Sequence, residues 1–208
     1  MVITWHVDPA RPDLQMIVRA VEILRRSGVV AYPTDTLYGL AVDPRSGDAV
    51  HRLFALKGRR PQSALPLIAA DVAQAELTGT FDAVARRLAA AWWPGPLTLV
   101  IPASPAIHRD ALAGGATVAV RVPAHAVARE LARAHEFPIS ATSANPSGTP
   151  ALASAGDVAL ALPGVDAILD AGPARGGAPS TIVEVGERGP RLIRAGAVPW
   201  ERVLESLE

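Results

Sequence analysis

The stretch from Val29 to Leu40 constrains the fold of this chain more than any other segment. Its first four residues, Val29 to Tyr32, are apolar or aromatic, a pattern that predicts a buried β-strand. Pro33 then fixes φ and removes an amide donor, so the strand is expected to end there. Two hydroxyls and a carboxylate follow directly, on Thr34, Asp35 and Thr36. The segment therefore predicts a strand that delivers polar side chains to one edge of a sheet.

This polar strand end has two interpretations. Ligands bind outside the carboxyl ends of strands in open α/β sheets, so the loop could form one wall of a binding site. Alternatively, Thr34 and Asp35 only cap the helix that follows. Gly39 fits either interpretation, since glycine allows a sharp turn or the close approach of a ligand.

The composition narrows the class of protein. Twenty basic and twenty acidic residues give zero net charge, so nothing global favours non-specific binding to nucleic acid or to a membrane surface. The absence of cysteine excludes disulfides and thiolate chemistry. The segment from Met1 to Pro12 lacks the features of a signal peptide, and no apolar run approaches membrane-spanning length. We expect a soluble, cytoplasmic protein that does not associate with membranes.

Apolar runs of strand length alternate with segments of helical periodicity along the whole chain. Strands are expected at Ile3–Val7, Val29–Tyr32, Leu65–Ala70, Leu97–Ile101, Thr117–Val122, briefly at Ile139, and at Ile168–Leu169, Thr181–Val185 and Arg191–Arg194. Helices are expected at Pro12–Arg26, Ala49–Leu56, Asp71–Leu77, Asp82–Trp92, His125–Ala134, Ser154–Leu162 and Pro199–Leu207. The alternation predicts an α/β fold, with one twisted, mixed and partly parallel sheet flanked by helices. No repeat or linker is visible, so residues 1–208 are expected to form a single domain.

Lys57 is the sole lysine among the twenty basic residues, and it stands in a cationic turn, Lys57-Gly58-Arg59-Arg60. A lysine kept where arginine is otherwise preferred suggests a need for a compact ammonium. The turn could clamp a polyphosphate between Lys57 and Arg59. It could equally complement the dipole of the helix that ends there.

Further polar features lie in loops or at strand ends. The loop after Ile139 carries four hydroxyls and one amide within nine residues, and such loops cradle phosphates or simply form polar turns. Arg121 sits in an apolar strand and must be paired there; we favour a ligand carboxylate or phosphate over a structural ion pair. Arg194 is a second cation at a strand end, and a glycine-rich loop delivers Ser180 to the start of another strand.

Common catalytic motifs are missing from the sequence. It has no phosphate-binding loop of the NTPase type, no dinucleotide fingerprint, no nucleophile elbow and no histidine pair with zinc spacing. The chain is rich in anion-binding groups and poor in acid–base pairs. This combination suits phosphoryl or nucleotidyl transfer, in which positioning and charge neutralisation supply most of the catalysis.

Several short segments, taken in order, resemble the YrdC/Sua5 family of threonylcarbamoyl-AMP synthases. They are Tyr32-Pro33-Thr34-Asp35-Thr36-Leu37-Tyr38-Gly39-Leu40, Lys57-x-Arg59, Trp93-Pro94-Gly95-Pro96-Leu97-Thr98, Val120-Arg121-Val122-Pro123, Thr142-Ser143-Ala144-Asn145-Pro146-Ser147-Gly148, Pro179-Ser180-Thr181-Ile182 and Ile193-Arg194-Ala195-Gly196. The resemblance spans nearly the whole chain. It implies a YrdC-like fold with a concave anion-binding cleft, in a short, TsaC-like form without the additional C-terminal domain of longer Sua5 proteins.

The resemblance implies an enzyme, a nucleotidyltransferase that converts L-threonine, bicarbonate and ATP into L-threonylcarbamoyladenylate and pyrophosphate. Mg²⁺ would be carried in with ATP, and no metal ligands of the protein's own are implied. A carbamate formed on the threonine amine would attack the α-phosphorus, while positive charge stabilises the departing pyrophosphate. The product would pass to a downstream threonylcarbamoyl transferase complex, for N6-threonylcarbamoyladenosine modification of tRNA.

The resemblance also implies roles for individual residues. The threonine site would comprise Thr34, Arg121, the backbone around Ala141, and Ser180. ATP would be held by Lys57, Arg59, Ser143, Asn145 and Arg194, with Ser63 and Thr117 beside them. Lys57 and Arg59 are the expected catalytic residues. The sequence departs from the family at one position. Family members often carry a histidine shortly after a Pro-Leu pair, whereas here Pro66-Leu67 is followed by Ile68-Ala69-Ala70. A threonine contact through that histidine is therefore not expected here.

Two rival functions would use the same residues. A basic concavity formed by Lys57, Arg59, Arg60, Arg121 and Arg194 could bind double-stranded RNA, as in a ribosome-maturation module, although the neutral net charge argues against it. The second is a carbamoyl-adenylate step like that of hydrogenase maturation proteins, with carbamoyl phosphate in place of threonine and bicarbonate. The sequence shows no zinc-finger or acylphosphatase-like segment of the kind that accompanies that step.

Overall fold

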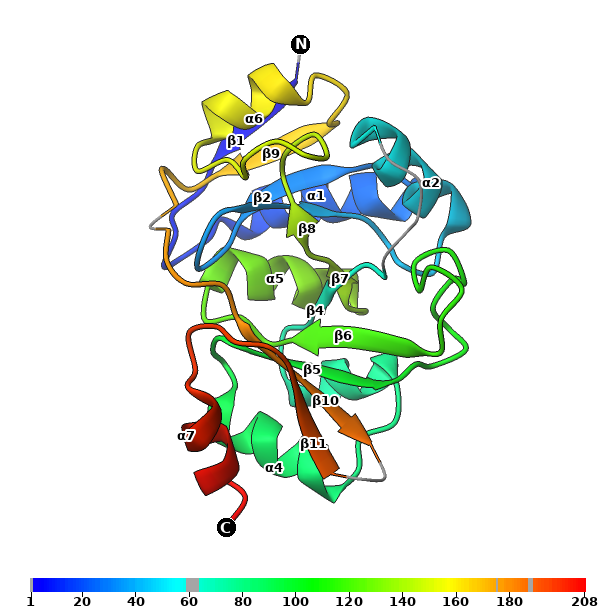
Figure 1. The fold of residues 1–208 in the computed structure, drawn as a ribbon. Coiled ribbons are helices and arrows are strands. Elements are labelled where there is room, and N and C mark those ends of the chain that lie inside the picture. The colour runs from blue at the N-terminus through cyan, green and yellow to red at the C-terminus, as the bar shows by residue number, and fades with distance from the viewer. Residues whose placement is uncertain (1, 59–63, 175, 187–188) are drawn as a thin grey trace.

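The computed structural model describes residues 2–58, 64–174, 176–186 and 189–208. Its strands form a five-stranded sheet of order β1-β9-β2-β3-β8 and a six-stranded sheet of order β11-β10-β5-β6-β4-β7. The first sheet lies toward the N-terminus and the second toward the C-terminus, with helices packed on both (Figure 1). The predicted α/β class is confirmed, but the strands of the described residues divide between two mixed sheets, whereas the sequence predicted one.

The elements have the following bounds. The five-stranded sheet contains β1 (Ile3–His6), β9 (Ala167–Asp170), β2 (Val30–Pro33), β3 (Tyr38–Ala41) and β8 (Thr142–Ser143). The six-stranded sheet contains β11 (Gly189–Arg194), β10 (Thr181–Gly186), β5 (Leu97–Pro102), β6 (Thr117–Arg121), β4 (Leu67–Ile68) and β7 (Ile139–Ser140). The helices are α1 (Leu14–Arg25), α2 (Gly47–Leu56), α3 (Val72–Ala75), the 3-10 turn η1 (Glu76–Thr78), α4 (Ala83–Trp92), α5 (Ala126–His135), α6 (Ala155–Ala161) and α7 (Trp200–Glu205).

Helices α1 and α5 form one side of the core. Each has an apolar face with helical spacing, Ile17, Ala20, Val21 and Leu24 in α1 and Val127, Ala128, Leu131 and Ala132 in α5. The two faces pack together and against the buried side chains of Val30 and Tyr32 in β2. No helix in the described part of the chain is long and apolar enough to cross a membrane.

The chain crosses from one sheet to the other at Ala141. This residue separates β7 of the six-stranded sheet from β8 of the five-stranded sheet. The buried Ser140 hydroxyl fixes the crossing, because it donates to the carbonyl of Leu40 at 2.9 Å and accepts the amide of Val42 at 2.9 Å. The Tyr32 hydroxyl donates to the carbonyl of Ser140 at 3.0 Å. The two sheets are thereby locked together beside the end of β3.

The stretch from Val29 to Leu40 forms a hairpin. The sequence predicted a strand that exits into a loop, but Tyr38–Ala41 is itself a strand, β3, paired antiparallel to β2. Gly39 therefore lies in a strand and makes no turn. A Cβ atom at Gly39 would lie 3.3 Å from the ring of Tyr32, so the close approach that glycine permits here is to a side chain of its own fold.

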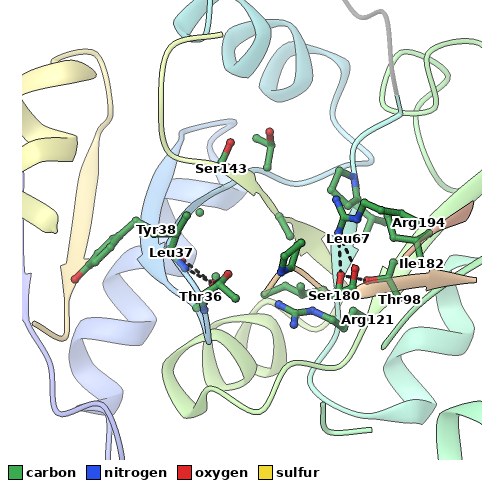
Figure 2. A pocket seen from close by; sticks show the side chains of 17 residues that line it. Thr36, Leu37, Tyr38, Leu67, Thr98, Arg121, Ser143, Ser180, Ile182 and Arg194 are labelled. Atoms are coloured by element: carbon green, nitrogen blue, oxygen red, sulfur yellow. Dashed lines mark hydrogen bonds between the residues drawn. The ribbon is translucent and has the colours of Figure 1, made fainter. Parts of the chain in front are cut away.

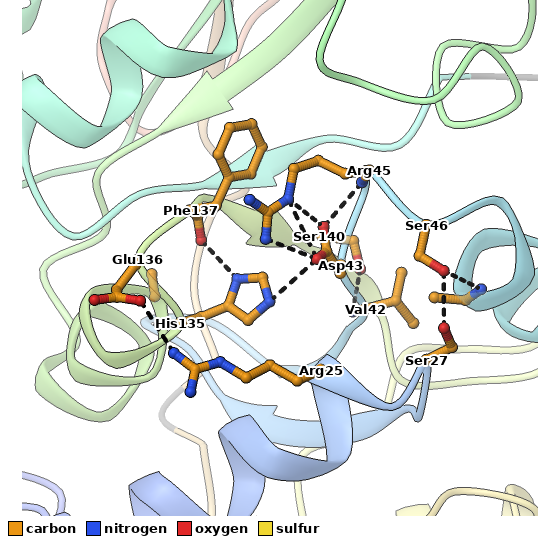
Figure 3. A network of polar contacts seen from close by, with 12 residues as sticks. Arg25, Ser27, Val42, Asp43, Arg45, Ser46, His135, Glu136, Phe137 and Ser140 are labelled. Atoms are coloured by element: carbon orange, nitrogen blue, oxygen red, sulfur yellow. Dashed lines mark hydrogen bonds and ion pairs between the residues drawn. The ribbon is translucent and has the colours of Figure 1, made fainter.

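A charged network ties the end of β3 to the end of α5 (Figure 3). The Asp43 carboxylate lies 2.8 Å from Arg45 Nη2 and 3.5 Å from Nε2 of the buried His135. Burial raises the pKa of Asp43, but its contact with the His135 ring and its hydrogen bonds from Arg45 outweigh this effect and hold the pKa well below its usual range. Because the folded-state pKa is lowered, Asp43 contributes stability that is present above its unfolded pKa of about 4 and is lost as the pH falls below it.

Candidate active site

A cavity of about 330 Å³ opens where the two sheets meet (Figure 2). The β2–β3 hairpin and β8 line one side, and the ends of β5, β6, β10 and β11 line the other. Thr34, Arg121, Ala141, Ser143, Ser180 and Arg194 are the predicted site residues that line it. Residues far apart in the sequence therefore meet around one volume, which is of the size of small-molecule sites.

Two sets of polar residues face this cavity. Thr34, Thr36 and Ser143, with the apolar Leu37 beside them, come from the five-stranded sheet and its hairpin, and we call them the hairpin wall. The residues Thr98, Arg121, Ser180 and Arg194 come from the six-stranded sheet, and we call them the cation wall. Ala141 lies at the crossing between them, and its amide donates to the carbonyl of Pro66 at 2.8 Å.

Arg121 is the most buried charge on the cation wall. Its side chain is 12 % exposed at the end of β6, between the buried Val120 and Val122. Its Nη1 atom lies 3.1 Å from Oδ2 of Asp35, an ion pair that crosses from one sheet to the other. The sequence favoured a ligand carboxylate or phosphate as the partner of Arg121; the structure shows Asp35 as a protein partner, and contact with a ligand stays a prediction. Because a guanidinium carries five N–H donors, a single-atom contact with Asp35 leaves capacity for a ligand.

Ser180 and Arg194 form a second polar group on the same wall. Arg194 Nη2 donates to the Ser180 carbonyl at 2.8 Å and lies 3.4 Å from its hydroxyl. The Thr98 hydroxyl, on a residue only 5 % exposed, lies 2.8 Å from that of Ser180. Thr98 lies in one of the motifs shared with the YrdC/Sua5 family, but the sequence predicted no role for it. Its position two residues after the Trp93-Pro94-Gly95-Pro96 break, near the start of a strand, was the available signal.

The Thr34 hydroxyl is engaged within its own turn. It donates to the Leu37 carbonyl at 2.6 Å and accepts the amides of Thr36 and Leu37 at 3.3 Å each. The Thr34 amide also donates to the Leu37 carbonyl, at 3.2 Å. Thr34 thus closes the hairpin loop while lining the cavity, and its predicted contact with threonine stays a prediction.

Lys57 lies behind the hairpin wall and holds the loop after β8. Its ammonium, on a residue 3 % exposed, donates to the carbonyls of Ser143 at 2.5 Å and Asn145 at 2.8 Å. The Ser147 amide donates in turn to the Lys57 carbonyl at 2.9 Å. The Asn145 amide group donates to the carbonyls of Pro146 and Thr149. Lys57 and Asn145 therefore shape the loop that carries Ser143 into the cavity.

Three other predicted residues stand apart from this arrangement. Arg59 and Ser63 lie outside the described residues. Thr117 begins β6, at the opposite end of the strand from Arg121, where it is exposed and pairs with Pro102. Thr117 is therefore not among the described residues that line the cavity. Its predicted contact with ATP stays a prediction.

The fold and the cavity define an α/β protein with a cationic, hydroxyl-lined cleft between two mixed sheets. Residues 22–196 match the protein family described as "Telomere recombination", which comprises Sua5, YciO and YrdC proteins. Since this match covers most of the chain, the chain belongs to the Sua5/YrdC family, and the resemblance inferred from the sequence is confirmed.

Named relatives and a solved structure agree with this membership. Proteins named threonylcarbamoyl-AMP synthase from Pyrococcus abyssi and Bacillus subtilis are 41% and 40% identical to it, over 88% and 96% of this chain. The crystal structure of P. abyssi Sua5 complexed with L-threonine superposes with a TM-score of 0.90 at 37% identity, covering 100% of this chain and 61% of that one. The chain spans 55% and 59% of the length of the two named relatives.

Proposed function

We propose that this chain is an L-threonylcarbamoyladenylate synthase, and hence a nucleotidyltransferase. It would convert L-threonine, bicarbonate and ATP into threonylcarbamoyl-AMP and pyrophosphate. The observation that carries the proposal is the meeting of two guanidinium groups, Arg121 and Arg194, with several hydroxyls around one cavity. Membership of the Sua5/YrdC family and the names of its relatives support the same reaction.

Threonine is proposed to bind against the cation wall. Its carboxylate would accept charge-assisted hydrogen bonds from Arg121, which lines the cavity at the end of β6. The paired hydroxyls of Ser180 and Thr98 offer polar partners for the threonine hydroxyl. A site that hydrogen-bonds this hydroxyl would discriminate strongly against valine, because valine would leave buried polar groups unpaired.

The ATP phosphates are proposed to lie toward Arg194 and Ser143. Lys57 and Asn145 would support this side by ordering the loop that carries Ser143. Arg59 would add positive charge. Mg²⁺ would enter with ATP as part of the substrate complex.

The chemical step would be an in-line displacement at phosphorus. An oxygen of the threonine carbamate attacks the α-phosphorus, and the bond from that phosphorus to the β-phosphate oxygen breaks. The carbamate oxygen is already anionic, so the step needs no general base. Positive charge from Arg194 and Arg59 would stabilise the departing pyrophosphate. The product would then serve a threonylcarbamoyl transferase that modifies tRNA.

A pyrophosphate-release assay with the purified chain tests the proposal. Release from ATP should require both L-threonine and bicarbonate, and valine should replace threonine poorly. Release that does not depend on threonine, or no release at all, would contradict the proposal. Release driven by carbamoyl phosphate would support the rival carbamoyl-adenylate step, and RNA affinity that survives millimolar ATP would support the RNA-binding module.

A further inference from the structure

Asp35 lies at the tip of the β2–β3 hairpin and contacts elements outside its own sheet. Its Oδ2 atom accepts a hydrogen bond from Arg121 Nη1 at 3.1 Å and from the Ala124 amide at 3.4 Å. Its Oδ1 atom accepts the His125 amide at 2.9 Å. One carboxylate therefore connects the hairpin of the five-stranded sheet to the end of β6 and to the start of α5.

These contacts fix where the Arg121 guanidinium lies. Burial of Arg121 to 12 % exposure would be costly without an anionic partner. Asp35 supplies that partner, and the two backbone amides hold the carboxylate itself in place. A guanidinium held at one N–H by a fixed carboxylate keeps its remaining donors in a defined orientation along the cavity.

We propose that Asp35 is a positioning residue, which orients Arg121 to receive the carboxylate of the amino-acid substrate. The inference rests on the proposed function, because it takes the substrate to be L-threonine. Arg121 lines the cavity but Asp35 does not, so Asp35 would act through Arg121 and not by touching the substrate. Fixing a binding group before the ligand arrives lowers the ordering cost of binding.

The geometry identifies Asp35→Asn as the informative substitution. The amide oxygen of asparagine can still accept the His125 amide, so the support of the α5 start is retained. Its NH₂ group would then occupy the place of Oδ2 and face two donors, Arg121 Nη1 and the Ala124 amide. The NH₂ group and Arg121 Nη1 would both be donors and could not hydrogen-bond each other, so the guanidinium would leave its position.

Binding is measured by calorimetry with two probes, L-threonine and L-threoninamide, which lacks the carboxylate charge. Asp35→Asn should weaken L-threonine binding at least 10-fold and change L-threoninamide binding less than twofold. Asp82→Asn is the matched control, because Asp82 caps α4 through the Ala85 amide at 2.7 Å and lies outside the cavity. It should change neither affinity. Asp35→Glu, which keeps the charge, should weaken L-threonine binding by less than Asp35→Asn.

A double substitution separates positioning from a general structural role. In an Arg121→Met background, Asp35→Asn should change L-threonine affinity less than twofold, because the group it positions is gone. Equal losses for both probes, or no loss for either, would overturn the role of Asp35 while leaving the proposed function intact. Failure of the parent chain to bind L-threonine would reject the proposed function and this inference together.

Discussion

The two walls of the cavity use their polar groups differently. On the hairpin wall the Thr34 hydroxyl bonds the backbone of its own turn, and behind this wall Lys57 bonds the carbonyls of the loop that carries Ser143. On the cation wall, Arg121 and Arg194 each contact the protein through one terminal nitrogen in the hydrogen bonds of the described residues. The Thr34 hydroxyl and the Lys57 ammonium are therefore bonded within the protein, whereas the two guanidinium groups of the cation wall keep donors for a ligand.

This difference suggests a division of labour. Groups already bonded within the protein, such as Thr34 and Lys57, hold the shape of the site at little cost on binding, whereas partly used guanidinium groups are suited to recognise anions. Asp35 belongs to the hairpin but serves the cation wall, through its contact with Arg121. Substitutions on the cation wall should therefore change substrate binding, and substitutions behind the hairpin wall should change stability.

The largest effect is expected from Arg121→Met. If Arg121 binds the carboxylate as proposed, the change removes those charge-assisted hydrogen bonds, so L-threonine affinity should fall at least about 100-fold, or about 2.7 kcal/mol. Calorimetric titration measures the affinity for L-threonine. Arg191→Met is the control, because Arg191 on β11 forms an exposed pair with Glu184 and should leave binding unchanged. A loss of less than about fivefold would contradict the assignment of recognition to the cation wall.

A smaller effect, on stability, is expected from Lys57→Met. The carbonyls of Ser143 and Asn145 lose their buried donor, which should lower the free energy of unfolding by about 2 kcal/mol. Denaturant unfolding measures this change in free energy. Arg25→Met is the control, because Arg25 forms an exposed pair with Glu136 and its loss should change stability little. Unchanged stability together with weakened ATP binding would instead make Lys57 a phosphate ligand, and the hairpin wall would lose its contrast with the cation wall.

The smallest effect is expected from Thr98→Val, a nearly isosteric change. It removes one hydroxyl hydrogen bond to Ser180, so the KM for L-threonine should rise about fivefold, equivalent to about 1 kcal/mol. The KM for ATP and the unfolding midpoint should stay unchanged. Thr98→Ser restores the hydroxyl and should recover the parent KM. If both variants behave alike, the hydroxyl pair is not part of threonine recognition.

The sequence predicted most elements of the fold, and its misses share one cause. Strands and helices with strong local periodicity, such as β5 and α1, lie close to their expected bounds. Strand β3 was missed because Tyr38–Ala41 carries a glycine and follows a polar turn, so its strand character depends on pairing with β2 and β8. Strand β8 has two residues, too few for any periodicity. Pairing partners, not local pattern, made these strands.

The site also divides into features that local motifs predicted and features that depend on contacts between distant segments. The ordered motifs indicated which residues to group, and Thr34, Arg121, Ala141, Ser143, Ser180 and Arg194 do line one cavity. The sequence could not show that Asp35 pairs with Arg121, or that Lys57 bonds two carbonyls, because both contacts join segments about 86 positions apart. The choice between ligand and structural partner for a buried charge requires knowing which groups surround it.

By itself, the sequence determined the α/β class and the family, and it grouped six candidate site residues that line one cavity, because local periodicity and short ordered motifs record these properties directly. Only the tertiary structure decided that the strands divide into two sheets, that the chain crosses between them at Ala141, and that the Val29–Leu40 stretch folds back as a hairpin. It also decided that Asp35 reaches Arg121 across the junction. These features arise from packing between distant segments, and no local pattern encodes which segments will meet.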